Sequence, residues 1–448
     1  MNQYKMFARF VIPSVLAFAL SGVYTIVDGF FVGRSMGDAG LSAINIAFPV
    51  VSLIQSLGTG IGMGGSVLWM VKKGTSGPEE AGKYVRGVLL LLLLVSIATT
   101  AGLLFVTEPI LRLFGAEGQL LVLGKEYLDV IVIGAAFQIF ATGIVPIIRN
   151  NGSSVFALIV MMSGFLTNIV LDYLFVWAFD MGTEGAAIAT ILGQAVTTVE
   201  AVAYLIYRKL PIKGSLSGFG RIAGNIARVG IAPFGLTLSP MVSLMLINRF
   251  SMMNGGEAAV ACYACLAYVL TIVQMLMQGV GDGSQPLISQ YYGEGKAAQV
   301  WHTRRVAYVT AIVLAFACNS LPFALRGGLG GLFGASESTG AMVAEVLPIF
   351  LLGLLFYAFS RITTSSFYAT EKNLYSYICV YAEPVLLLIL LFILPGFLGQ
   401  SGVWWSVVSS QILTAFLALL FKLRGDRESP RPEPLRIQQK KPSLDMDM

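Results

Sequence analysis

The sequence predicts an all-α polytopic membrane protein whose twelve transmembrane helices form two parallel six-helix bundles. Three observations predict this fold class: the composition, the number of apolar segments and an internal repeat. Of the 448 residues, 56% are hydrophobic and only 12% are charged, whereas soluble domains have about 25% charged residues. A chain this apolar suits the interior of a bilayer better than it suits water.

About twelve segments are long enough to cross a bilayer, for which a helix needs about 20 apolar residues. Six lie in the first half, near residues 7–32, 41–71, 84–106, 121–147, 153–178 and 184–207. Six lie in the second half, near residues 227–253, 257–282, 303–325, 339–361, 374–395 and 401–423. The first segment contains Asp28 and runs directly into the next, so we interpret it as a retained membrane helix rather than a cleaved signal peptide.

The basic residues predict the orientation of these segments. If the N-terminus is cytoplasmic and the segments alternate, only five of the 29 Lys and Arg residues fall outside, as the positive-inside rule requires. These five are Arg34, Arg112, Lys125, Arg249 and Arg326. We therefore expect a multi-pass protein of the cell's inner (plasma) membrane with both termini in the cytoplasm. The proline-rich stretch 425–448 is expected to be a disordered cytoplasmic tail.

The two halves of the chain resemble each other when one is shifted against the other by about 219 residues. Gly60, Gly62 and Gly64 then fall on Gly279, Gly281 and Gly283, and at a shift of 217 Gly182, Gly185 and Gln194 fall on Gly399, Gly402 and Gln411. Each half has an even number of spans, so the repeats have the same orientation in the membrane. We expect a lobe at 1–208, a cytoplasmic linker at 209–224 and a second lobe at 225–424. Two similar lobes that face each other are typical of a transporter.

Several other function classes are disfavoured by the residues. Cys262 and Cys265 form a C-x-x-C, but His302 is the only histidine, and we interpret the cysteines as packing residues. No Walker A motif occurs, and the closely spaced glycines lie in apolar helix, where they favour helix packing over phosphate binding. No basic stripe predicts binding to nucleic acid. We expect no cofactor and no metal beyond a possible coupling Na⁺.

Four segments in order resemble the multidrug and toxic compound extrusion (MATE) exporters. They are VDGFFVGRSMGDAGLSA at 27–43, TNIVLDYLFV at 167–176, GTEGAAIAT at 182–190 and GVGDGSQPLISQYYGEG at 279–295. The resemblance covers residues 5–424, and the last of these segments is similar to the bacterial multidrug-efflux subgroup. The loop motif of the major facilitator superfamily, the other 6+6 architecture, is missing. The resemblance implies a transporter that is driven by an ion gradient and is not an enzyme.

Ionisable residues deep in membrane helices are costly and are therefore candidates for function. Asp28 and Asp172 are each expected about 7–8 Å below the outer interface, at 1.5 Å per helical residue. Thr190 lies at similar depth, and Asn168 is one turn from Asp172 on the same helix face. The resemblance implies a cation site at the same four positions. Two adjacent carboxylates can share a proton, and with the Asn and Thr oxygens they could instead coordinate Na⁺. A purely structural hydrogen-bond network remains the alternative.

The second lobe departs from this pattern, since Asn248 stands where Asp28 would be. Glu383 is its only deep carboxylate and is a secondary candidate. Asp282 lies toward the cytoplasmic side and is another, for which a boundary or gating role is as consistent as ion binding. Adaptable side chains that could line a substrate cavity are Met161, Phe165, Met241, Met245, Met275 and Gln278.

The sequence thus favours an antiporter that exports amphipathic, cationic drugs or toxic compounds by alternating access, in exchange for H⁺ or Na⁺. Its expected partners are small organic cations and membrane lipids, and we expect a monomer. One alternative is a flippase for lipid-linked precursors with the same superfold, which would need a basic cavity. The other is a polytopic membrane enzyme, which would need a catalytic cluster that a single histidine does little to supply. The sequence does not decide between H⁺ and Na⁺ or identify the compound.

Overall fold

The chain folds almost entirely into helices, because a backbone in lipid must satisfy its own hydrogen bonds. The computed structural model describes residues 3–212, 214–215, 217–332 and 336–428. The first half forms α1 (Gln3–Thr75), α2 (Pro78–Leu104), α3 (Thr107–Leu113), α4 (Gly118–Ile133), α5 (Ala135–Asn150), α6 (Ser154–Asp172), the π-helix η1 (Tyr173–Ala178) and α7 (Gly182–Tyr207). The second half forms α8 (Phe219–Gly293), α9 (Ala297–Ala324), α10 (Arg326–Leu332), α11 (Glu337–Ala369), α12 (Asn373–Leu398) and α13 (Gln400–Glu428).

Two of these helices are each two membrane spans joined at a kink. Gly37 interrupts α1 with φ 62° and ψ −152°, and Gly256 interrupts α8 with φ 64° and ψ −160°. By contrast, α4 and α5 together make one span, bent by 56°. Among the described residues, ten helical segments are apolar and long enough to cross a membrane when the two parts of α1, Gln3–Thr25 and Ala39–Thr75, are counted separately and α8 is counted once. The bent pair of α4 and α5 raises the number to eleven. Dividing the 75-residue α8 at its kink gives twelve spans, which agrees with the predicted fold class.

The same turns recur in both halves of the backbone. Left-handed φ angles occur in the pairs Gly37 and Gly256, Gly77 and Gly295, Gly152 and Glu371, and Gly182 and Gly399. The members of these pairs are separated by 219, 218, 219 and 217 residues, which are the shifts at which the sequence repeats. The members of each pair lie at matching helix ends, helix starts or kinks, so the backbone repeats where the sequence repeats.

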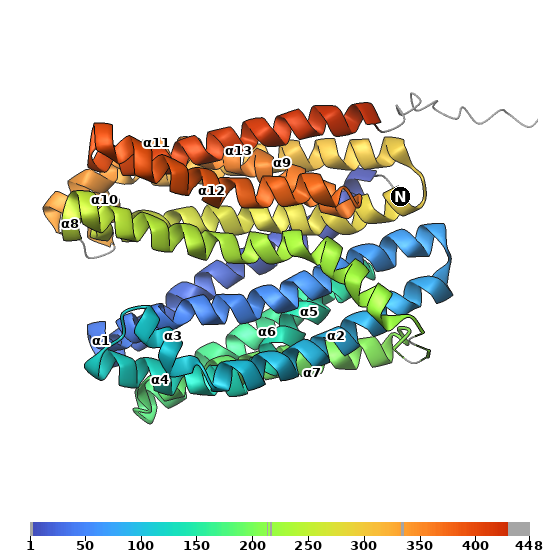
Figure 1. The fold of residues 1–448 in the computed structure, drawn as a ribbon, viewed down its shortest axis with the longest axis horizontal. Coiled ribbons are helices and arrows are strands. Elements are labelled where there is room, and N and C mark those ends of the chain that lie inside the picture. Colours follow the sequence, from blue (N-terminus) through green and yellow to red (C-terminus); the bar gives the residue numbers. More distant parts are fainter. Residues whose placement is uncertain (1–2, 213, 216, 333–335, 429–448) are drawn as a thin grey trace, which may run out of the picture.

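The helices form two stacked groups, the N-terminal lobe (α1–α7) and the C-terminal lobe (α8–α13) (Figure 1). The first helix of each lobe crosses into the other lobe's core. Phe7, Phe10 and Val11 at the start of α1 belong to a buried cluster with residues of α8, α9 and α11. Ile222 and Ile226 at the start of α8 belong to the core of the N-terminal lobe. The two lobes are therefore held together where α1 and α8 begin.

Glycines allow the helices of the two lobes to approach closely. A Cβ added at Gly64 would lie 2.4 Å from the carbonyl oxygen of Ile226, and one added at Gly74 would lie 2.4 Å from the carbonyl carbon of Gly293. No side chain fits at such distances, so the backbones of α1 and α8 pack directly. This confirms the helix-packing interpretation of the closely spaced glycines.

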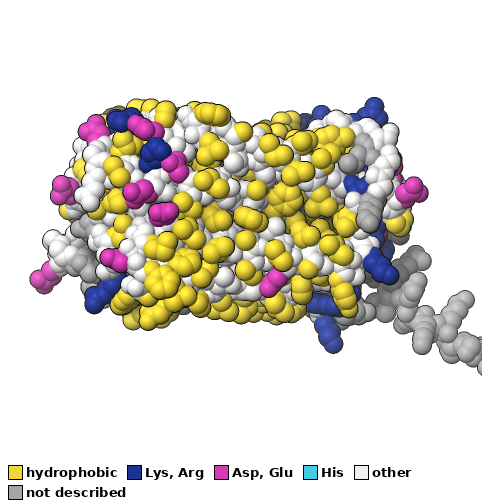
Figure 2. Space-filling model, turned by 90° about the horizontal axis from the view of Figure 1, so that it is seen from below, with side chains coloured by type: hydrophobic (Ala, Val, Ile, Leu, Met, Phe, Trp, Pro, Cys, Tyr) yellow, Lys and Arg dark blue, Asp and Glu magenta, His cyan; other side chains and the backbone are white. Residues whose placement is uncertain are grey.

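The molecule has two different ends. We call the end with the N-terminus and the turns near Gly77, Gly152, Gly218 and Gly295 the basic end, and the end with Gly37 and Gly256 the kink end. Figure 2 shows an apolar middle, and on this face charged side chains lie mostly toward the two ends. The five basic residues expected outside lie in or beside helices that border the kink end: Arg34, Arg112, Lys125, Arg249 and Arg326.

Two expected boundaries differ in the structure. Helix α8 begins at Phe219, inside the expected linker 209–224. Helix α13 continues to Glu428, four residues into the expected tail, because Asp426 forms ion pairs with Arg304 and Lys422. The remainder of that tail, 429–448, lies outside the described residues.

Candidate functional site

The two deep carboxylates of the N-terminal lobe meet in the structure. Asp28 is in the first span of α1, and Asp172 is the last residue of α6. Their carboxyl groups lie within hydrogen-bonding reach of each other. Asp172 is completely buried, whereas Asp28 is partly exposed. Two carboxylates this close repel each other in a low dielectric unless a proton or a cation lies between them.

The surroundings of Asp172 are rich in oxygen and poor in donors. Among the described residues, neither oxygen of its carboxylate accepts a hydrogen bond, and the buried Oδ1 of Asn168 also has no donor. The amide nitrogen of Asn168 points the other way and donates to Thr190 Oγ1 at 3.5 Å. Three buried acceptor oxygens without donors are expensive for a protein. They suit a site that takes up a positive charge.

A close crossing of α6 and α7 brings Asn168 and Thr190 together. A Cβ at Gly164 of α6 would lie 2.1 Å from Thr197 Oγ1, and a Cβ at Gly193 of α7 would lie 2.7 Å from the Gly164 carbonyl oxygen. Small residues at both positions let the two backbones touch. The side chains one turn toward the kink end therefore face each other at short range.

Two tyrosines complete the cluster, and neither was predicted from the sequence. The Tyr24 hydroxyl lies within hydrogen-bonding reach of Thr190, and its ring stacks on Phe165 with centroids 4.9 Å apart. The buried Tyr127 of α4 lies close enough to both carboxylates to interact with them electrostatically. Tyr24 is one helical turn before Asp28, and that spacing could have indicated it. Tyr127 has no comparable local signal, because it belongs to a different helix.

The helix that contains Asp172 changes geometry immediately after it. Residues Tyr173–Ala178 form a π-helix, a rare widening of the helix that is frequent at functional sites. Ser35 of α1 donates to the Val176 carbonyl at 3.1 Å, so this π-helix is tied to the same span that holds Asp28. The widened turn fixes where α6 ends relative to α1.

The oxygen atoms of the cluster are of the chemical types that suit a proton or a hard cation. Its ligands are carboxylate, amide and hydroxyl oxygens, which are the types that hard cations prefer. In the described part of the chain no group of three or more His, Cys, Asp or Glu side chains could hold a metal ion. The arrangement therefore does not resemble a zinc or transition-metal site.

Glu383, the carboxylate of the C-terminal lobe that the sequence selected, has different surroundings. Glu383 of α12 is partly exposed and lies within hydrogen-bonding reach of Gln411 of α13. Tyr263 and Tyr357 lie close enough to interact with it electrostatically. A Cβ at Gly353 would lie 2.1 Å from the Gln411 side-chain oxygen, so this glycine makes room for the amide. In the part of the chain that the structure describes, Glu383 has a neutral amide as its hydrogen-bonding neighbour and no second carboxylate beside it.

Asp282, the other secondary candidate, is already neutralised by arginines. Arg361 of α11 donates to its Oδ1 at 3.0 Å, and Arg149 of the N-terminal lobe lies 3.7 Å from its Oδ2. The Tyr368 hydroxyl donates to the same Oδ1 at 3.3 Å. All three charged side chains are buried. A carboxylate held by two guanidinium groups has little capacity left for a coupling ion, which the sequence alone did not reveal.

The candidate cavity residues differ in burial and in the residues that they contact. Phe165 stacks on Tyr24 beside the carboxylate pair, and Met275 of the C-terminal lobe packs near Gly22 of α1, where an added Cβ would lie 3.3 Å from its sulfur. Met161 packs against the core of its own lobe, and Met245 is exposed. Met241 and Gln278 are partly exposed. Among these six residues, Phe165 has a described contact with the N-terminal cluster, through its stacking on Tyr24.

The chain matches known proteins over nearly its whole length. A family model described as MatE matches residues 13–174 and 233–395, one match in each lobe. Multidrug export protein MepA of Staphylococcus saprophyticus is 25% identical over 430 residues, 93% of each chain. MepA of Staphylococcus aureus strain NCTC 8325 is 24% identical over 428 residues, again 93% of each chain.

Solved structures share the fold. An outward-facing multidrug resistance MATE family transporter of the MOP superfamily has a TM-score of 0.88 and 24% identity, covering 95% of this chain and 96% of the other. A MOP superfamily transporter from Pyrococcus furiosus has a TM-score of 0.89 and 24% identity, covering 96% and 98%. At this identity the likeness establishes the twelve-helix architecture and nothing finer.

Proposed function

This chain belongs to the MatE family of membrane transporters, and on that premise we propose that it exports amphipathic, cationic drugs or toxic compounds in exchange for H⁺ or Na⁺. The observation that supports the proposal most is the pair of Asp28 and Asp172. Their carboxyl groups are adjacent, and both oxygens of Asp172 are buried without a donor among the described residues. Such a pair gains most from an incoming positive charge.

The substrate class follows from charge and from the similar proteins. The similar proteins MepA are named multidrug export proteins. In this chain Asp28 and Glu383 are partly exposed acids within the spans, and both favour a cationic compound. Aromatic faces beside the first acid, Tyr24 and Phe165, add a surface suited to flat organic cations.

We propose that the basic end faces the cytoplasm. The positive-inside rule supports this orientation. It makes the kink end, with the Asp28 and Asp172 pair nearer to it, the extracellular side. In this orientation the plasma membrane protein would take up its coupling ion from outside and release its substrate there.

Alternating access would open and close the contacts between the lobes at the basic end. There Asn150 and Gln285 hydrogen-bond reciprocally at 3.1 and 3.2 Å, and Arg149 lies beside Asp282 across the lobe boundary. Tyr84 of α2 also accepts from Asn225 of α8 at 3.4 Å. These contacts support a state closed toward the cytoplasm, and inward opening would have to separate them.

A flippase for lipid-linked precursors is less well supported. Its anionic cargo would need free basic side chains in the cavity. The deep arginines Arg149 and Arg361 are both engaged by Asp282, while the unsatisfied polar atoms near Asp172 are acceptors. The polarity of the N-terminal lobe thus favours a cation.

Transport in proteoliposomes tests the proposal. We expect Asp28→Asn and Asp172→Asn to lower ion-driven efflux of a fluorescent organic cation to about a tenth or less, since each removes a charge on which coupling depends. Asp129→Asn is the matched control, because that acid lies in the same lobe but pairs with Lys125 at 2.6 Å. Imposing a pH gradient and a sodium gradient separately identifies the ion. Wild-type efflux by both pair variants would refute the assignment.

A further inference from the structure

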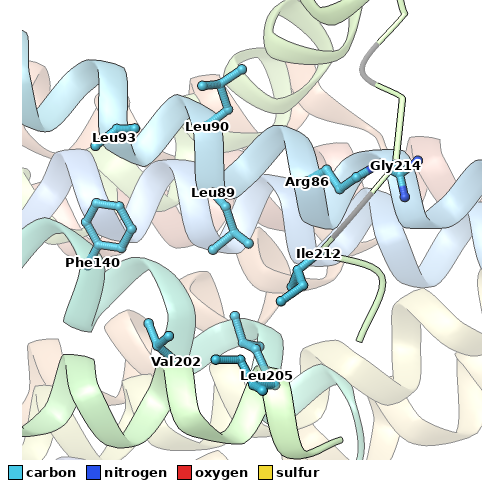
Figure 3. A pocket seen from close by; sticks show the side chains of 10 residues that line it. Arg86, Leu89, Leu90, Leu93, Phe140, Val202, Leu205, Ile212 and Gly214 are labelled. Carbon is cyan, nitrogen blue, oxygen red and sulfur yellow. The ribbon is translucent and has the colours of Figure 1, made fainter. Parts of the chain in front are cut away.

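A groove of about 400 Å³ opens on the outer face of the N-terminal lobe, toward the basic end. It has one polar end and a long apolar body (Figure 3). Its walls include Arg86, Leu89, Leu90 and Leu93 of α2, Phe140 of α5 and Val202 of α7. The groove is separate from the carboxylate cluster, and the proposed transport mechanism does not use it.

The α2 side of the groove is a single helical stripe. Positions 86, 89, 90 and 93 follow the spacing that brings side chains to one face of a helix. A basic side chain in line with apolar ones is not required for packing a helix in a membrane. Here Arg86 lies at the end nearest the start of α2, so the groove begins with a guanidinium group at the basic end and continues as hydrocarbon toward the middle of the membrane.

The linker between the lobes keeps the guanidinium at the groove's mouth. The Nη1 atom of Arg86 lies 3.5 Å from the carbonyl oxygen of Pro211. A Cβ at Gly214 would lie 3.2 Å from Arg86 Cζ, so a glycine lets the linker pass beside the side chain. Ile212 and Gly214 of the linker line the groove as well. A molecule in the groove would therefore touch both α2 and the linker.

The charges around the mouth favour an anion. Arg208 and Lys209 follow the end of α7 at the same end of the molecule. Lys83 lies one turn before Arg86, although Glu80 pairs with it at 2.5 Å. Glu79 is the other acid of that turn. A cationic amphiphile would meet Arg86 at the mouth and be repelled, whereas a phosphate would be attracted.

We propose that this groove binds an anionic phospholipid of the leaflet at the basic end, with its phosphate on Arg86 and one acyl chain along Leu89, Leu90 and Leu93. Basic pockets between membrane helices recognise anionic headgroups, and a guanidinium group matches a phosphate in charge and shape. The apolar body accepts a chain, which free phosphate lacks. The lipid would join the interlobe linker to the N-terminal lobe.

Native mass spectrometry of the full-length protein tests this. Delipidated protein in detergent is mixed with phosphatidylglycerol or with phosphatidylcholine of the same acyl chains. We expect the wild type to retain one phosphatidylglycerol in preference to phosphatidylcholine. Arg86→Gln should weaken that binding about fivefold, the effect of one cationic side chain at an anionic headgroup. Arg305→Gln is the control, because Arg305 is a basic residue of the other lobe that lies over Trp301.

A second variant tests the contribution of the acyl chain to binding separately from that of the headgroup. Leu90→Trp should fill the groove while keeping Arg86, and should lower retention of both lipids. Inorganic phosphate added in excess should not displace the bound lipid, since the acyl chain contributes to binding. Equal retention by wild type and Arg86→Gln, an equal loss in Arg305→Gln, or undiminished binding by Leu90→Trp would overturn the proposal. If Arg86→Gln fails to fold, the preference of the wild type for phosphatidylglycerol over phosphatidylcholine tests the headgroup, and Leu90→Trp tests the chain; loss of either result overturns the proposal.

Discussion

Two buried carboxylates, Asp172 and Asp282, have opposite surroundings. Asp172 faces a second carboxyl group and no donor among the described residues, whereas Asp282 accepts from Arg361 and Tyr368 and lies beside Arg149. The first lies within one lobe near the kink end, and the second joins the two lobes near the basic end. A carboxylate that is fully paired stabilises one arrangement, while one that lacks a partner can exchange a proton or an ion. This difference supports a structural role for Asp282 and the proposed ion-binding role for Asp172.

The largest expected effect on stability comes from removing the paired charge. Asp282→Asn leaves two buried guanidinium groups without their counter-ion, and breaking a buried pair in this way costs about 3–5 kcal/mol. We expect a clear fall in the thermal unfolding midpoint of the purified protein in detergent. Glu257→Gln, at an exposed acid near the kink of α8, is the control. An unchanged midpoint for Asp282→Asn would mean that the arginines are solvated and that Asp282 does not join the lobes.

Asp172→Asn should behave in the opposite way. It removes charge repulsion from Asp28, so the unfolding midpoint should stay the same or rise while ion-driven transport is lost. The thermal unfolding midpoint and the rate of ion-driven efflux are measured on the same preparation of purified protein. If Asp172→Asn were as destabilising as Asp282→Asn, the N-terminal cluster would be a structural network and the proposed coupling role would be wrong.

The close contact between the lobes gives a third test. Gly64→Ala adds a Cβ 2.4 Å from the Ile226 carbonyl oxygen, and overpacking of this kind costs about 1–3 kcal/mol. Gly102→Ala is the matched control, since nothing lies within 4 Å of an added Cβ there and alanine favours helix by about 0.5–1 kcal/mol. We expect the midpoint to fall for the first variant and to hold or rise for the second. The same result for both would mean that the lobes do not pack directly at Gly64.

The smallest effect should come from the C-terminal lobe. Glu383 already has Gln411 as a neutral partner, so Glu383→Gln should reduce efflux of a cationic dye by roughly two- to fivefold, the effect of one exposed charge of about 0.5–1 kcal/mol. The ion requirement should not change. Competition assays with cationic and neutral compounds of similar size measure the effect. A complete loss of ion dependence would show that the coupling site extends into this lobe.

Much of the fold was predictable because the membrane acts on short stretches of sequence. Each span must be apolar over about 20 residues, and the five basic residues expected outside the cell all border the kink end. The repeat was visible as glycine pairs such as Gly182 and Gly399, and the structure explains that pair by its shared left-handed φ angles of 60° and 56°. Asp28, Asn168, Asp172 and Thr190 could be selected individually from depth and helix spacing, and the structure brings them together.

The partners of these residues were not predictable in the same way. Tyr127 reaches the carboxylate pair from α4, and Arg149 reaches Asp282 from the opposite lobe. Neither contact leaves a periodic pattern in the sequence, because the residues are far apart in the chain. For the same reason the sequence did not indicate that Arg149 and Arg361 lie beside Asp282.

The sequence by itself determined that this protein spans the membrane about twelve times as two similar halves, with one half richer in deep acids. The bilayer imposes those features residue by residue, through the cost of exposing polar groups to lipid. Only the tertiary structure decided which acids meet each other and which meet arginines. That choice depends on how closely α1, α6, α7 and α8 cross, and glycine contacts such as Gly164 with Gly193 and Gly64 with Gly230 set those distances.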